Sequence, residues 1–159
     1  MQPAPTGSPA AHPQAEKKRG QYFGGEFQFA SWASARGWLT AFDAATGAPR
    51  WRYHSSKPMI GGVAVTGGDV VFAGEITGDF LVFDANDGKV LYRHNVGGPI
   101  AGGIVSYAAG GKQYVAVVSG FVGGYYNQMA PAIGGGNPTI TVFSLKPVMA
   151  KSSLEQKSR

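Results

Sequence analysis

The sequence has no cysteine and no long apolar run. The absence of cysteine excludes disulfide bonds, thiolate metal sites and a cysteine nucleophile. No apolar stretch reaches the roughly 20 residues that a membrane-spanning helix needs, so we expect no transmembrane segment. Residues 1–20 are rich in Pro, Ala, Ser and Gln and lack the apolar core of a signal peptide. We expect this stretch to be a disordered leader.

Charged residues are also few, at 14% of the chain, although the formal net charge is +5. Between Gly20 and Leu145 the sequence has seven basic and seven acidic residues, so the body of the protein is neutral. The whole basic excess lies in the two ends of the chain. A nucleic-acid-binding domain needs a basic patch on its folded surface. We therefore expect no nucleic-acid partner.

What the chain does contain is a repeat. Gly37-Trp38-Leu39-Thr40-Ala41-Phe42-Asp43-Ala44-Ala45-Thr46-Gly47 returns as Gly78-Asp79-Phe80-Leu81-Val82-Phe83-Asp84-Ala85-Asn86-Asp87-Gly88, at an offset of 84 − 43 = 41 residues. A period near 40 with strand-like content is typical of a β-propeller with one four-stranded blade per repeat. Closure needs at least about four blades. At this period 159 residues hold fewer than four.

Runs of strand-forming residues bounded by Gly, Asp or Asn predict the blades. We expect half a blade, then one complete blade, then three strands of another, over residues 37–44 and 50–54, then 62–66, 69–74, 79–85 and 89–95, then 103–108, 113–119 and 139–145. The 25 glycines suit the tight turns of such a fold, including a Gly67-Gly68 hairpin turn. The prediction is an all-β, partial β-propeller of four-stranded antiparallel blades over residues 21–146, followed by a polar tail at 147–159.

The third blade carries an insertion from Gly120 to Pro138, and long loops of this kind are often functional. This blade also lacks a fourth strand. In closed propellers the last blade is commonly completed by a strand from the other end of the chain. We therefore expect this chain to be the C-terminal part of a larger propeller.

The segment Ala41-Phe42-Asp43-Ala44-Ala45-Thr46-Gly47-Ala48-Pro49-Arg50-Trp51 resembles the tryptophan-docking motif of the quinoprotein alcohol dehydrogenases, eight-bladed enzymes that use pyrroloquinoline quinone (PQQ). In such a motif the Asp accepts turn amides, the Gly adopts a positive φ and the Trp packs between blades. The second copy departs from the motif at Val82 and Tyr92. Residues 61–74, 111–120 and 139–143 also resemble the C-terminal end of that family.

The resemblance implies oxidation of an alcohol or sugar, with two electrons passing to PQQ held over Ca²⁺ or a lanthanide ion and then to a cytochrome or quinone acceptor. It also implies a periplasmic location. The metal ligands and the catalytic Asp of this family belong to earlier blades, so the sequence assigns no catalytic and no metal residue here. We expect the isolated chain to be inactive and prone to association, because its terminal blades would expose apolar faces.

Four residues are candidates for cofactor binding under this resemblance. Gly61 and Gly62 begin an inner strand, and Phe121 and Tyr125 lie in the insertion, where the family often has Trp. The competing interpretation is that the glycines serve close packing and that the aromatic residues simply close the blade.

Other titratable residues have a structural explanation. Asp43 and Asp84 occupy equivalent turn positions, so we expect them to be turn residues rather than bases or metal ligands. His12, His54 and His94 share no metal-ligand spacing.

Two other functions stay open. Propellers with the same motif serve as non-enzymatic assembly scaffolds in the bacterial envelope, and absence of the axial carboxylates from a complete propeller would favour that function. The third alternative is a short protein whose copies close a ring by oligomerising.

Overall fold

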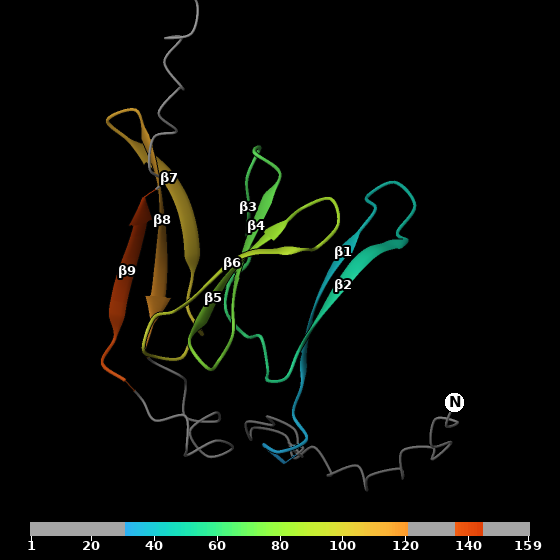
Figure 1. The fold of residues 1–159 in the computed structure, drawn as a ribbon, viewed down its shortest axis with the longest axis horizontal. Coiled ribbons are helices and arrows are strands. Elements are labelled where there is room, and N and C mark those ends of the chain that lie inside the picture. The colour runs from blue at the N-terminus through green and yellow to red at the C-terminus, as the bar shows by residue number, and fades with distance from the viewer. Residues whose placement is uncertain (1–30, 121–135, 145–159) are drawn as a thin grey trace, which may run out of the picture.

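The computed structural model describes residues 31–120 and 136–144, which form three antiparallel sheets standing side by side in chain order (Figure 1). Within these ranges the chain consists of strands and turns, with no helix, which confirms the all-β prediction. The predicted leader at 1–20 and tail at 147–159 lie outside the described residues.

The sheets contain two, four and three strands, each paired with its neighbour in sequence. The first sheet is β1 (Gly37–Phe42) and β2 (Pro49–Ser55). The middle sheet is β3 (Ala64–Val65), β4 (Val70–Gly74), β5 (Asp79–Asp84) and β6 (Val90–Asn95). The last sheet is β7 (Ile104–Ala109), β8 (Lys112–Ser119) and β9 (Thr139–Ser144). This is the predicted half blade, complete blade and three-stranded blade.

One strand is markedly shorter than predicted. We expected residues 62–66 to form a strand, but β3 covers only Ala64 and Val65. The reason is that the amide of Gly62 does not pair within its own sheet. It donates to the carbonyl of Gly102, at 2.9 Å, in the segment that leads into the next sheet.

The two repeated turns have the structure that the motif predicts. Asp43 Oδ1 accepts hydrogen bonds from the amides of Ala45 (3.1 Å) and Thr46 (2.9 Å) and from the Thr46 hydroxyl (2.9 Å). These hydrogen bonds lower the pKa of Asp43, and the bond from the Thr46 hydroxyl has the largest effect. Gly47 has a φ of 71°. Asp84 accepts from the Asn86 amide in the same way. Both carboxylates are therefore turn residues, as expected.

The turn between β3 and β4 lies where the Gly67-Gly68 pair predicted it, but its left-handed residue is different. Asp69 has a φ of 57°, and neither glycine has a positive φ. Aspartate is one of the few residues with a side chain that adopt this conformation readily. The Asp69 carbonyl accepts the amide of Ala85 at 2.9 Å, so a contact within the middle sheet fixes this conformation.

The middle sheet is covered on both faces. We call its contact with β1–β2 the first joint and its contact with β7–β9 the second joint. Val71, Ala73, Leu81 and Phe83 form the buried core of the first joint. The second joint has its own cluster, which contains Phe72, Phe80, Ile100, Ile104, Val115 and Val117. Because successive residues of β4 and β5 point to opposite faces and both faces are covered, these strands are apolar except for Asp79 and Asp84 at the two ends of β5.

The first joint is closed by a tryptophan. The indole of Trp51 stacks on Phe83, with ring centroids 6.1 Å apart and planes 20° apart, and its Nε1 donates to the Ala85 carbonyl at 2.9 Å. A Cβ on Gly88 would lie 2.6 Å from this indole. The predicted packing of Trp51 between blades is thereby confirmed.

The outer faces of the first and last sheets carry exposed apolar side chains. Trp38 and Phe42 on β1 are 55% and 60% exposed, and Ile140 and Val142 on β9 are 66% and 50% exposed. This confirms that the terminal blades have apolar outer faces. The association that we expect from them stays a prediction.

Replacing Trp51 with Ala should destabilise the fold by about 3 kcal/mol, the lower end for a Trp→Ala change, because the indole is only partly buried. Urea unfolding followed by circular dichroism measures the effect. Trp38→Ala is the matched control, since Trp38 lies on the exposed outer face, and should cost no more than about 0.5 kcal/mol. Equal losses in the two variants would contradict the docking role of Trp51.

Candidate functional site

The two candidate glycines lie where the middle sheet meets the last sheet. A Cβ on Gly61 would be 3.0 Å from the Ile100 carbonyl oxygen, and one on Gly62 would be 3.3 Å from the Ile104 amide nitrogen. Gly62 also donates to Gly102, as described above. The structure therefore supports the packing interpretation of Gly61 and Gly62, because the two chain segments approach closely here.

The start of the insertion is fixed to the same segment. The amide of Gly120 donates to the Pro99 carbonyl at 2.9 Å, and a Cβ on Gly98 would lie 3.0 Å from the Gly120 Cα. Gly120 has a φ of 95°, which glycine adopts at little cost. Residues 98–103 thus contact both the Gly61–Gly62 pair and the base of the insertion. We call this group, Gly61, Gly62, residues 98–103 and Gly120, the glycine edge.

The two aromatic candidates, Phe121 and Tyr125, lie outside the described residues. The structure brings Gly61 and Gly62 together with the residue that precedes Phe121 and leaves the position of both aromatic side chains as a prediction.

Ser119, next to Gly120, is a residue that no sequence pattern indicated. It ends β8, is 2% exposed, and its hydroxyl has no hydrogen-bond partner among the described residues. A buried hydroxyl without a partner is costly. Its position beside Gly120 makes Ser119 a candidate contact for a group bound at the glycine edge.

A polar network around the buried Glu75, which no sequence pattern indicated, spans the first joint. The Tyr53 hydroxyl on β2 donates to Glu75 Oε1 at 3.1 Å and accepts from Arg93 Nη2 at 2.8 Å. Arg93 Nη1 donates to Asp79 Oδ2 at 2.8 Å and lies 3.6 Å from Glu75 Oε2. Glu75 is 5% exposed, so its charge needs these partners. The network is a structural connection between sheets, because each charged group has its partner within it.

The network shifts two pKa values. Burial, then the negative charge of Glu75, raises the pKa of the Tyr53 hydroxyl. Burial by itself would lower the pKa of Arg93, but Tyr53, Glu75 and Asp79 together outweigh it and raise that pKa. Both shifts favour the protonated forms of Tyr53 and Arg93 in the folded protein.

The described residues include no group of three His, Asp or Glu side chains arranged to hold a metal ion. His54 stacks on Trp38 with ring centroids 5.1 Å apart, and the ring of His94 lies 5.6 Å from that of Phe143. His12 lies outside the described residues. The described part of the chain therefore does not fit the metal ion of the quinoprotein enzymes, and no catalytic step can be derived through that ion here. The groups here that suit contact with PQQ are the backbone of Gly61 and Gly62, which carry no side chain, and the Ser119 hydroxyl.

Comparison with known proteins agrees with this architecture. Residues 35–123, which are 89 of the 159 residues, match a family model described as outer membrane protein assembly factor BamB. The chain is 41% identical over 91 residues to the dehydrogenase subunit of a quinone-type alcohol dehydrogenase from Gluconacetobacter polyoxogenes, covering 57% of this chain and 12% of that protein. It is 40% identical over 91 residues to a cytochrome c-linked 1-butanol dehydrogenase from Thauera butanivorans, covering 57% and 13%.

Among solved structures, the fold matches a europium-containing methanol dehydrogenase with a TM-score of 0.63 and 28% identity, over 70% of this chain and 24% of that one. The sheets are therefore β-propeller blades. The chain belongs to the PQQ-dependent, or quinoprotein, alcohol dehydrogenase family. It spans about an eighth of the length of the curated relatives that it matches. Within residues 31–120 and 136–144 no helix is long and apolar enough to cross a membrane.

A methyl group added at Gly61, where the glycine edge is closely packed, should destabilise the protein. Gly61→Ala would bring Cβ to 3.0 Å from the Ile100 carbonyl, and we expect a loss of about 1 to 3 kcal/mol. Gly103→Ala is the control, because its Cβ would meet nothing within 4 Å. Thermal unfolding of both variants measures the difference. A Gly61→Ala protein as stable as Gly103→Ala would contradict the close packing.

The raised pKa of Tyr53 makes the first joint sensitive to alkali. Because the folded pKa lies above the unfolded value of 10.0, the contribution of Tyr53 is fully present below pH 10 and is lost as the pH rises through the folded pKa. The free energy of unfolding of Tyr53→Phe should therefore fall less than that of the wild type at alkaline pH. Tyr107→Phe, which removes an exposed hydroxyl on β7, should behave as the wild type. Identical alkaline slopes for wild type and Tyr53→Phe would contradict the network.

Proposed function

We propose that this chain forms blades of a PQQ-dependent alcohol dehydrogenase. Such an enzyme oxidises an alcohol or sugar, passes two electrons to PQQ and then to a cytochrome or quinone, and works in the periplasm. The observation that carries the proposal is 41% identity over 91 residues to the dehydrogenase subunit of a quinone-type alcohol dehydrogenase. The acceptor class is supported by the cytochrome c-linked 1-butanol dehydrogenase.

Within such an enzyme, the role of this chain is to bind and shape rather than to transfer protons. Gly61 and Gly62 would form part of the wall around PQQ, with Phe121 and Tyr125 of the insertion beside it. Glycines suit this position because a flat backbone allows close approach of a planar group. PQQ supplies the two-electron acceptor when bound. Its Ca²⁺ or lanthanide ion would take ligands from other blades, and a europium-containing relative of this fold supports the lanthanide alternative.

The second candidate function is a non-enzymatic propeller that assembles envelope proteins. The description of the matching family model, an outer membrane assembly factor, favours it. A scaffold needs the docked blades but no wall for a cofactor, so the two functions differ in what they require of the glycine edge.

A chimera tests the enzymatic proposal. The 91-residue stretch of the Thauera butanivorans 1-butanol dehydrogenase that matches this chain is replaced by the corresponding residues of this chain. We expect PQQ-dependent oxidation of 1-butanol, followed by cytochrome c reduction, at a rate within about tenfold of the parent's. This range allows a loss of up to about 1.4 kcal/mol in transition-state binding. A folded chimera, checked by its melting temperature, that binds no PQQ would contradict the proposal and favour the scaffold.

The isolated chain should show no activity of its own. We expect no reduction of an artificial electron acceptor by alcohol when the chain is supplied with PQQ and Ca²⁺, because the described residues provide no metal site. The parent dehydrogenase under the same conditions is the positive control. Turnover by the isolated chain would contradict the assignment of the metal ligands to other blades.

A further inference from the structure

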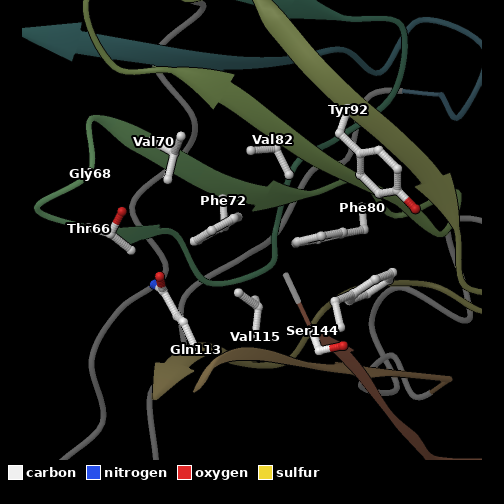
Figure 2. Close-up of a pocket in the computed structure, with 11 residues that line it drawn as sticks. Thr66, Gly68, Val70, Phe72, Phe80, Val82, Tyr92, Gln113, Val115 and Ser144 are labelled. Carbon is white, nitrogen blue, oxygen red and sulfur yellow. The ribbon is translucent and has the colours of Figure 1, made fainter. Parts of the chain in front are cut away.

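The second joint contains a cavity, and comparison with the first joint indicates what it binds. It has a volume of about 470 Å³ and lies between the middle sheet and sheet β7–β9. Figure 2 shows Phe72, Phe80 and Val82 on one wall and Val115 on the other. None of its 11 lining residues is charged. Its volume is in the range of ordinary small-molecule sites, about 300 to 1,000 Å³.

The cavity lies at the position that a docking tryptophan fills in the first joint. Tyr92 is the repeat equivalent of Trp51, at the offset of 41 residues, and Val82 is the equivalent of Ala41. Each pair is matched across its hairpin, Ala41 with Trp51 and Val82 with Tyr92. The second joint thus has a phenol where the first has an indole, and Tyr92 lines the cavity.

The aromatic contacts show how the two joints differ. Phe143 has in the second joint the position that Phe83 has in the first. Tyr53, two residues after Trp51, meets Phe83 edge on with ring centroids 4.9 Å apart, and His94, two residues after Tyr92, meets Phe143 edge on at 5.6 Å. Trp51 stacks on Phe83 with an angle of 20° between planes. Tyr92 instead stands at 78° to Phe143 and is 45% exposed. No side chain of β6 therefore stacks on Phe143 as Trp51 stacks on Phe83.

The residues of the turn that receives the indole are also replaced. In the first joint Trp51 donates to Ala85, in the turn that Asp84 begins, and lies over Gly88. After Phe143 the sequence has Ser144 in place of that Asp and Val148 in place of that Gly. Both halves of the docking motif, the Trp and the Asp and Gly of the receiving turn, are thus absent from the sequence of the second joint.

We propose that this cavity binds a small, neutral aromatic molecule of one or two fused rings, of the size and shape of indole. The rings of Phe72 and Phe80 are 18° from parallel, and those of Phe80 and Phe143 are 20° from parallel. Such a set favours a flat ring by offset stacking. The ligand is neutral, because a charge would be desolvated among uncharged side chains.

The polar lining residues determine which hydrogen-bonding groups suit the edge of the ligand. Figure 2 shows Thr66 and Gln113 near each other at one end of the cavity and Ser144 next to Val115, on the wall formed by the last sheet. Gln113 uses its amide nitrogen to donate to Ser106, at 2.9 Å, so its side-chain oxygen is the acceptor that a ligand can use. One N–H or O–H on the ring suits this acceptor. The site is independent of the proposed cofactor site, because the glycine edge contributes none of its lining.

Titration of the full chain with indole tests the proposal. Isothermal calorimetry should give saturable one-to-one binding, with a Kd on the order of 0.1 mM for so small a ligand. Tyr92→Trp should weaken indole binding at least about tenfold, because the new side chain fills the cavity, and should raise the melting temperature. Tyr107→Trp, which adds the same ring on the exposed face of β7, should leave the Kd within about twofold.

Two results would overturn the proposal. The first is equal indole affinity in the wild type, in Tyr92→Trp and in Val82→Phe, a second variant that fills the cavity. The second is an absence of binding in the wild type. If binding then appears when Leu145, Val148 and Met149 are changed to Ser, the chain after Ser144 is the occupant instead. The readout requires neither PQQ nor alcohol, so its failure is distinct from failure of the proposed enzymatic function.

Discussion

The docking of Trp51 onto the middle sheet is the interaction on which the rest of the structure depends. A two-stranded hairpin such as β1–β2 is marginally stable alone and needs a partner for its apolar face. The indole supplies that partner contact in two ways, by stacking on Phe83 and by donating to Ala85. The turn that receives it must carry glycine at position 88, because a side chain there would occupy the space of the indole. One aromatic residue and one glycine, in neighbouring repeats, therefore set how the first two sheets are placed.

The inner ends of the sheets are placed by a different constraint. At the glycine edge, backbone meets backbone, and Gly62 uses its amide to bind the next blade rather than its own. This shortens β3, and it brings Gly61, Gly62 and the base of the insertion to one segment. Gly61 and Gly62 themselves carry no side chain. A cofactor wall and a packing contact are thus compatible uses of these two residues.

Much of the fold could be predicted from the sequence because its elements are local. The strand runs, the Asp43 and Asp84 turns and the 41-residue period are properties of neighbouring residues, and the structure agrees with them except for the shortened β3. Contacts between repeats could not be predicted in the same way. Glu75 reads as an ordinary charged residue, and only the folded chain brings Tyr53 and Arg93 to it. The left-handed Asp69 beside two glycines was missed for the same reason, since its carbonyl partner comes from β5 and its turn. For the candidate site, Gly61 and Gly62 were selected through the family resemblance, and their role at a cofactor stays a prediction, whereas Ser119 has no sequence signal.

A double-mutant cycle between Trp51 and Gly88 tests the docking account most directly, with Gly47 as the internal reference. Gly47 and Gly88 have similar φ angles, 71° and 75°, but a Cβ on Gly47 would meet nothing within 4 Å. Gly47→Ala therefore measures the cost of the backbone conformation alone. The account predicts that Gly88→Ala costs clearly more than Gly47→Ala in the wild type, and about the same as Gly47→Ala once Trp51 is changed to Ala. An unchanged cost of Gly88→Ala in the two backgrounds would show that the indole does not hold the sheets together.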